Sequence, residues 1–183
     1  MNNMSNKKYD NAKQNLVGKV GEEKVIELLK KISSVVRIDD VSDISEYQLE
    51  DVDLLVYCVV DGKQKLRKIE IKTDERAGET GNFFVEKSIH YLKDIHDEEG
   101  NLIYEKGQIR QGWLYASKAD WFFWYVPGNK KIYACSAKQL RRYVQKYCFR
   151  TVTCNDGYKV IQGYIVPIEK LCEKCKVWQW DVE

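Results

Sequence analysis

Two strand-like runs joined by Asp61-Gly62 constrain the fold of this chain more than any other feature. The first run, DVDLLVYCVV (51–60), is almost entirely apolar, and the second contains RKIEIKTDE (67–75). An Asp-Gly pair between two such runs is a strong signal for a β-hairpin, so we expect the runs to pair as antiparallel neighbours. A sheet built around this hairpin is the first expectation.

Four charged residues fall in unusual places on and beside this hairpin. Side chains alternate along a strand, so Glu70 and Lys72 share one face about 7 Å apart. Asp53 lies near the start of the first run, and the hairpin brings its carboxylate beside Glu70. In the helix predicted over 17–31, Glu22 lies on the apolar face. Taken singly, each is explained by an ion pair, a turn or a helix N-terminus, but their joint occurrence favours a working site.

The other segments predict a central sheet flanked by helices. VVRI (35–38) and GNFFVEK (81–87) read as strands, and residues 88–111 as a hairpin that leaves the core. ADWFFWYVP (119–127) is so apolar that we expect it to be a central strand, ended by its proline and the following glycine.

The C-terminal third continues this alternation. KIYACS (131–136) reads as a strand, and AKQLRRYVQKY (137–147) as a helix with an apolar stripe. GYIVPI (163–168) is expected to be a closing strand, followed by a short helix and the motif CEKC. We therefore divide the chain into a flexible N-terminal segment (1–16), a core (17–147) and a C-terminal extension packed on the core (148–183).

Composition places limits on the partners. The 183 residues suit one domain, and 30 basic against 28 acidic residues give a net charge of only +2. A polyanion site must therefore be local. The sequence has no apolar run long enough to span a bilayer, and its N-terminus lacks an apolar signal core, so we expect a cytoplasmic protein without a membrane partner.

Six cysteines are interpreted as reduced thiols in such a compartment. Cys172-x-x-Cys175 could complete a four-thiolate zinc site with Cys148 and Cys154. The gap between Cys148 and Cys154 is wider than usual for zinc, and cysteine is an ordinary buried residue, so buried thiols are the preferred interpretation.

The ordered segments resemble the PD-(D/E)xK, or restriction-endonuclease-like, nuclease superfamily, of phage and bacterial type. The matching stretches are GEEKVIELL (21–29), DVDLLV (51–56), IEIKT (69–73), GNFFVE (81–86) and SKADWFFWY (117–125). Together they span residues 17–126. Two departures are Val52 where the motif name has proline, and the 88–111 insertion.

The resemblance implies a restriction-endonuclease-like core with a mixed β-sheet, and a Mg²⁺-dependent endodeoxyribonuclease that hydrolyses DNA with an activated water. Mn²⁺ would substitute for Mg²⁺. Asp53, Glu70 and the carbonyl of Ile71 would hold the metal ion, because Mg²⁺ prefers oxygen ligands. Lys72 would orient or activate the water and offset charge on the phosphate. Glu22 could bind a second metal ion or steer the water. Glu86 is a further candidate ligand, with an ion pair to Lys87 or Lys118 as its alternative role.

Basic residues outside the motif are the candidates for DNA contacts. They are Lys118, Arg141, Arg142 and Lys146, of which the last three lie on one side of the helix predicted over 137–147. A solvated basic helix face is the commoner explanation of such a cluster.

Three functional alternatives stay open at this point. The chain could be a nuclease that acts on duplex or single-stranded DNA, or a Holliday junction resolvase that works as a homodimer on branched DNA. It could also be a non-catalytic member of the same fold that binds DNA or protein. The complete set of Asp53, Glu70 and Lys72 argues for catalysis, because a degenerate site would be expected to lose one of them.

Overall fold

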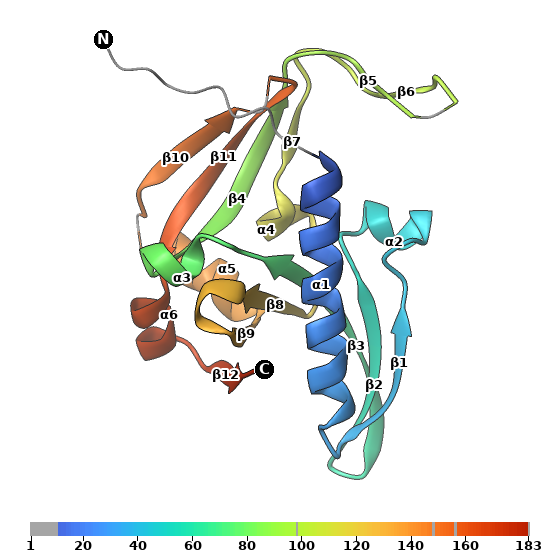
Figure 1. Ribbon diagram of the computed structural model, residues 1–183, viewed down its shortest axis with the longest axis vertical. Helices are drawn as coiled ribbons and strands as arrows, with labels where there is room; N and C mark the ends of the chain where they lie inside the picture. The colour runs from blue at the N-terminus through green and yellow to red at the C-terminus, as the bar shows by residue number, and fades with distance from the viewer. Residues whose placement is uncertain (1–10, 98, 148, 156, 183) are drawn as a thin grey trace.

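The computed structural model describes residues 11–97, 99–147, 149–155 and 157–182, with the backbone alone for 11–15. The chain is an α/β protein with a mixed sheet flanked by helices, and a second sheet packs beside the first (Figure 1). None of the described helices is long and apolar enough to cross a membrane.

The main sheet has six strands in the order β1-β2-β3-β8-β9-β12. Its strands are β1 (Val35–Asp40), β2 (Leu54–Val60), β3 (Lys63–Thr73), β8 (Trp121–Val126), β9 (Lys131–Ser136) and β12 (Val177–Asp181). All neighbours are antiparallel except β3 and β8, which run parallel. The predicted hairpin is confirmed, because β2 and β3 pair through a turn in which Asp61 and Gly62 have φ of 53° and 71°. The predicted central strand β8 is confirmed as well.

Helices cover both faces of this sheet. Helix α1 (Asn11–Lys30) lies along β3, where its Val25 and Leu29 pack against Leu54, Ile69 and Phe123 (Figure 1). Helix α5 (Ala137–Lys146) packs on the opposite face through a buried stripe that includes Leu140, Tyr143 and Val144. Residues 11–16, which we assigned to a flexible segment, belong to α1; residues 1–10 lie outside the described part of the chain.

The second sheet has four strands in the order β10-β11-β4-β7. These are β10 (Thr151–Asn155), β11 (Lys159–Pro167), β4 (Asn82–Tyr91) and β7 (Ile109–Gln111). Phe83 of β4 stacks on Trp124 of β8, with ring centroids 4.6 Å apart, and this contact joins the two sheets through one core. The predicted excursion is confirmed for the hairpin of β5 (Ile95–His96) and β6 (Leu102–Tyr104), which projects from the end of this sheet (Figure 1). Its predicted bounds were too wide, because residues 88–91 belong to β4 and 109–111 to β7.

Four short helices and a 3₁₀ turn connect the strands. They are α2 (Ser45–Leu49), α3 (Ala77–Thr80), α4 (Trp113–Ala116), α6 (Ile168–Lys174) and η1 (Pro127–Asn129). The segment 148–183 contributes more than a surface layer: β10 and β11 form half of the second sheet, and β12, which we did not expect, extends the main sheet beside β9.

Arg141 connects two helices. Its Nε donates to the carbonyl of Leu114 at 2.6 Å and its Nη2 to the carbonyl of Ser117 at 2.7 Å, while the guanidinium lies over the Phe122 ring. The guanidinium thus supplies hydrogen bonds at the C-terminal end of α4. Two of its donor groups serve the fold, and the prediction that Arg141 contacts DNA stays a prediction.

Arg141→Ala should lower the free energy of unfolding by about 2 kcal/mol, since it removes charge-assisted hydrogen bonds from partly buried carbonyls. Arg142→Ala, at an exposed position of the same helix, is the matched control and should change it by less than about 0.5 kcal/mol. Urea unfolding of the three proteins measures both values. Equal stability of the two variants would contradict this role for Arg141.

Candidate active site

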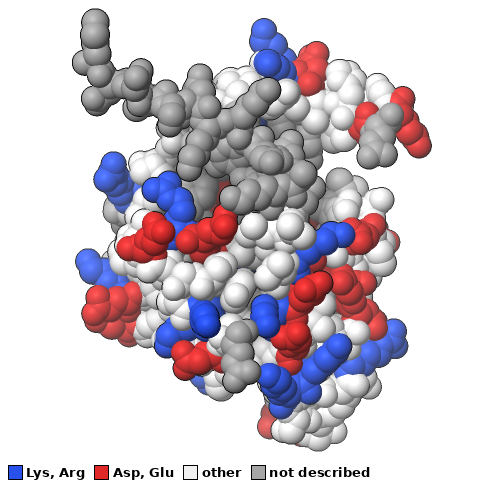
Figure 2. Space-filling view, in the orientation of Figure 1, with Lys and Arg blue, Asp and Glu red and all other residues white. Residues whose placement is uncertain are grey.

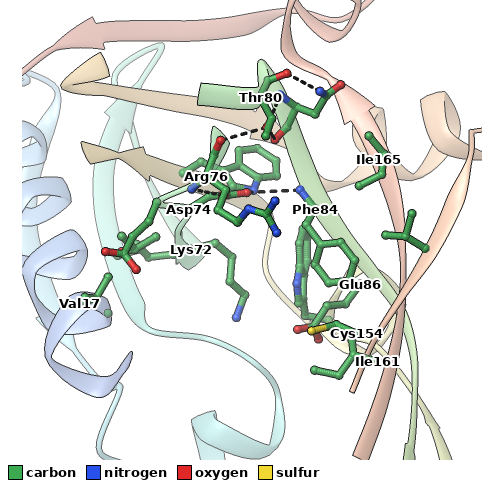
Figure 3. A pocket seen from close by; sticks show the side chains of 18 of the residues that line it. Val17, Lys72, Asp74, Arg76, Thr80, Phe84, Glu86, Cys154, Ile161 and Ile165 are labelled. Carbon is green, nitrogen blue, oxygen red and sulfur yellow. Dashed lines mark hydrogen bonds between the residues drawn. The ribbon is translucent and has the colours of Figure 1, made fainter. Parts of the chain in front are cut away.

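A cleft of about 990 Å³ lies between α1 with the end of β3 on one side and the second sheet on the other (Figure 3). The predicted residues Glu22, Asp53, Ile71, Lys72 and Glu86 all line it. Glu70 lies beside them through its ion pair with Lys72. The structure therefore brings together the main predicted site residues, which come from four separate segments of the chain.

Asp53 directly precedes β2 and is fixed by the neighbouring strand. Its N–H donates to the carbonyl of Ile69 at 2.9 Å, and its Oδ2 accepts the N–H of Ile71 at 2.6 Å. Burial raises the pKa of Asp53 to about 6, against the opposing effects of the Lys72 charge and the Ile71 N–H. These two hydrogen bonds hold Asp53 against the edge of β3, just before the first residue of β2.

Glu70 is the most deeply buried acid of the site. The residue is 2% exposed, its Oε1 forms an ion pair with Lys72 Nζ, and its Oε2 is buried without a hydrogen-bond partner in the described chain. Burial raises the pKa of Glu70 to about 7, because it outweighs the attraction of the Lys72 ammonium; the charge of Asp53 adds to the rise.

Lys72 is the cation of the site. Burial lowers its pKa, but the carboxylates of Glu70, Asp53 and Glu86 outweigh burial and raise the pKa above its ordinary value. The side chain is 33% exposed, and Nζ lies 5.8 Å from the Trp113 ring centroid. Lys72 is therefore an ammonium at neutral pH in this arrangement, which suits it to pair with an anion rather than to remove a proton from water.

Glu22 and Glu86 face the cleft from opposite sides. Helix α1 can pass close to β3 because residue 21 is glycine: a Cβ there would collide with the Thr73 hydroxyl. This close approach places Glu22 at the cleft, where burial and the charges of Asp40 and Asp43 raise its pKa. Glu86 reaches the cleft from β4 (Figure 3).

Sequence reasoning missed four charged residues of the cleft: Asp74, Glu75, Arg76 and Arg150. Asp74 organises the turn after β3, because its carboxylate accepts the N–H groups of Arg76, Ala77 and Phe84 at 3.0, 2.9 and 3.3 Å. The position of Asp74 one residue after the IEIKT strand was an available signal for this turn. Arg150 carried no local signal, because the β10-β11 hairpin reaches the cleft only through the long-range pairing of β11 with β4.

The predicted DNA-binding residues lie elsewhere. Lys118, Arg141, Arg142 and Lys146 are absent from the residues that line the cleft. Lys118, Arg142 and Lys146 are exposed, and Lys146 lies over the Tyr147 ring. On the face seen in Figure 2, acidic and basic side chains are interspersed rather than gathered into a basic surface.

The described cysteines do not assemble the predicted zinc site. Cys154 lines the cleft from β10, whereas Cys172 and Cys175 lie at α6, where they pack against the core that contains the buried Cys135 of β9. Burial raises the pKa of the Cys135 thiol to about 12 and raises those of Cys172 and Cys175 too, which disfavours thiolate ligands. Cys148 lies outside the described residues.

Across the part of the chain that the structure describes, no three His, Cys, Asp or Glu side chains form a group that could hold a metal ion. Comparisons with protein-family models, curated proteins and solved structures found no significant match for this chain. The cleft residues and their geometry are therefore the basis on which the function of this chain is inferred.

Glu70 should make stability depend on pH. Its pKa is raised in the folded protein, so its stabilising contribution is fully present below pH 4.5, its ordinary pKa, and is lost as pH rises through about 7. The free energy of unfolding of the unmodified protein relative to Glu70→Gln should therefore fall over this range and stay level above it. Urea unfolding from pH 4 to 8 measures the difference, with the exposed Glu23→Gln as control. A difference that rises with pH would contradict the burial argument.

Proposed function

We propose that this chain is a metal-dependent endodeoxyribonuclease of the PD-(D/E)xK type. The observation that carries the proposal is the meeting of Asp53, Glu70 and Lys72 at one cleft, where two carboxylates and an ammonium from adjacent strands are partly or fully desolvated. Buried like charges of this kind are costly and concentrate at functional sites.

The arrangement of the main sheet also supports this proposal. The antiparallel pair β2-β3 carries Asp53 at its edge and Glu70 with Lys72 on β3, and β8 runs parallel to β3 with its apolar side chains buried. Helices α1 and α5 cover the two faces. A mixed sheet flanked by helices, with the acidic residues on its central strands, is what the resemblance led us to expect.

The donor atoms suit Mg²⁺ better than a metal that needs a complete protein cage. Mg²⁺ keeps several waters and is commonly held by one or two carboxylates together with substrate phosphates. Glu70 Oε2 is buried without a partner in the described chain, and the two carboxylates repel each other. Asp53 and Glu70 would hold the ion, and its positive charge would offset their repulsion.

The carbonyl of Ile71 is a third suitable donor. In a strand, the N–H and C=O of one residue point to the same edge. The N–H of Ile71 donates to Asp53 Oδ2, so its carbonyl points to the same edge of β3, beyond the start of β2. The backbone therefore directs an oxygen toward Asp53, and this donor would not be found in a search for acidic or histidine side chains.

The residues of the chain would divide the work as follows. A bound Mg²⁺ would supply a Lewis acid for the phosphate and lower the pKa of a bound water. Lys72, as an ammonium, would bind the phosphate and stabilise the charge that develops on it. Its present partner is Glu70, so the ion pair must loosen for Lys72 to reach a substrate. The carboxylates of Glu22 and Glu86 would add negative charge to the cleft and would accept hydrogen bonds from its water molecules.

Lys72→Ala should lower the rate of DNA cleavage by at least about 100-fold, because it removes the cation that would stabilise the phosphate. The matched control is Lys68→Ala: Lys68 lies on the same face of β3 and is paired with Glu50, but does not line the cleft. Supercoiled plasmid, single-stranded circles and a four-way junction with Mg²⁺, Mn²⁺ or EDTA provide the measurement. Unchanged cleavage by Lys72→Ala would exclude this mechanism, and binding without cleavage would favour the non-catalytic alternative.

Mg²⁺ alone should stabilise the folded protein. At about ten times its Kd the gain is about 1.4 kcal/mol, since the ion binds the folded state selectively. Asp53→Asn and Glu70→Gln should each remove this gain, whereas Glu23→Gln should keep it. Thermal unfolding with and without Mg²⁺ measures the effect, and the same gain in all four proteins would refute the assigned ligands.

A further inference from the structure

The wall of the cleft opposite Glu22 and Asp53 carries an apolar patch beside the carboxylate of Glu86. It is formed by the second sheet, and its apolar residues are Phe84, Val152, Ile161 and Ile165. Phe84 and Ile165 are direct partners in the pairing of β4 with β11. A phosphodiester site that needed only to hold phosphate would gain nothing from such a wall, so the wall points to a second group on the substrate.

Phe84 presents a ring to this cleft. A Cβ at residue 163 would collide with the Phe84 ring, so Gly163 is what allows the ring to lie close against β11. The neighbouring Phe83 points the other way and is fully buried against Trp124. The ring of Phe83 therefore lies in the core, whereas the ring of Phe84 lies in the cleft and remains partly exposed there.

Two arginines add positive charge around this wall. Arg76 and Arg150 line the same cleft, and within the described chain neither guanidinium has an ion pair or side-chain hydrogen bond. Figure 3 shows Lys72 and Arg76 reaching into the space between α1 and the second sheet. Unpaired guanidinium groups beside an aromatic ring combine the two features by which proteins hold single-stranded nucleic acid.

The size of the cleft limits the substrate. Its volume of about 990 Å³ lies at the upper end of pockets that enclose small ligands, about 300–1,000 Å³. Such a space suits one or two nucleotides. In a duplex the faces of the bases are covered by stacking, so a paired base could reach Phe84 only after it had been unstacked.

We propose that this cleft selects a single-stranded segment of DNA, with one unpaired base stacked on Phe84 and the adjoining phosphates bound by Arg76 and Arg150. This inference depends on the proposed nuclease function for its biological meaning, but it makes a claim about binding that can be tested without cleavage. Phe84 is then the residue that determines specificity, and the acidic side of the cleft is where the phosphodiester is cut.

The test is equilibrium binding in EDTA, which prevents metal-dependent cleavage. Fluorescence anisotropy compares a labelled single-stranded oligonucleotide with a hairpin duplex of the same sequence. The unmodified protein should bind the single strand at least about tenfold more tightly, and Phe84→Leu should lose about tenfold on the single strand alone, because base–aromatic stacking is lost. Phe84→Trp should retain the binding.

Three controls separate stacking from other causes. Phe84→Leu keeps an apolar side chain over Gly163, and thermal unfolding verifies that each variant is folded. Trp178→Ala removes an exposed aromatic residue outside the cleft and should leave binding unchanged. Arg76→Gln with Arg150→Gln should weaken binding and flatten its salt dependence.

Equal affinity for the two DNAs, or single-strand binding that Phe84→Leu leaves unchanged, would overturn this inference. Neither result would affect the proposed nuclease, which is tested separately by Lys72→Ala. Conversely, a protein that cuts no DNA but binds the single strand through Phe84 would retain this inference and lose the nuclease.

Discussion

The buried ion pair of Glu70 and Lys72 is the interaction on which the site depends. A carboxylate that is 2% exposed would be very costly without a partner, and the ammonium two residues along the same strand offsets much of that cost. The offset is incomplete: Glu70 keeps one buried oxygen without a hydrogen-bond partner in the described chain, and its pKa rises to about 7. Strand β3 therefore holds a carboxylate oxygen that a metal ion or a substrate could bind.

The buried carboxylate of Glu70 is tolerated because the surrounding structure fixes β3 on both edges and both faces. Strand β2 pairs along one edge and β8 along the other, α1 packs over one face, and an aromatic core around Trp124 fills the opposite side. These contacts belong to segments far apart in the chain, so no local rearrangement can release Glu70 without disturbing the sheet. The stability of the core thus permits an unfavourable arrangement of charges at one place.

The two sheets give the cleft two different walls. The main sheet and α1 contribute carboxylates and Lys72, which suit a metal ion and a phosphate. The second sheet contributes Phe84, the aliphatic side chains around it and the carboxylate of Glu86, and Arg76 and Arg150 also line the cleft. With this arrangement, one wall of the cleft could bind the phosphate of a nucleotide and the other could bind its base. Strands β10 and β11 therefore belong to the site, although they come from the end of the chain.

The sequence by itself determined the local parts of this protein: the β2-β3 hairpin through its turn, the shared face of Glu70 and Lys72 through strand alternation, and the inward position of Glu22 through helical periodicity. These depend on neighbours a few residues apart. Only the tertiary structure decided that β10 closes the cleft with Arg150, that Arg141 donates a hydrogen bond to a carbonyl of α4, and that Cys154 lies apart from the thiols at α6. The reason is physical: pairing between distant strands and the burial of a side chain are set by the packing of the whole chain, which no local pattern encodes.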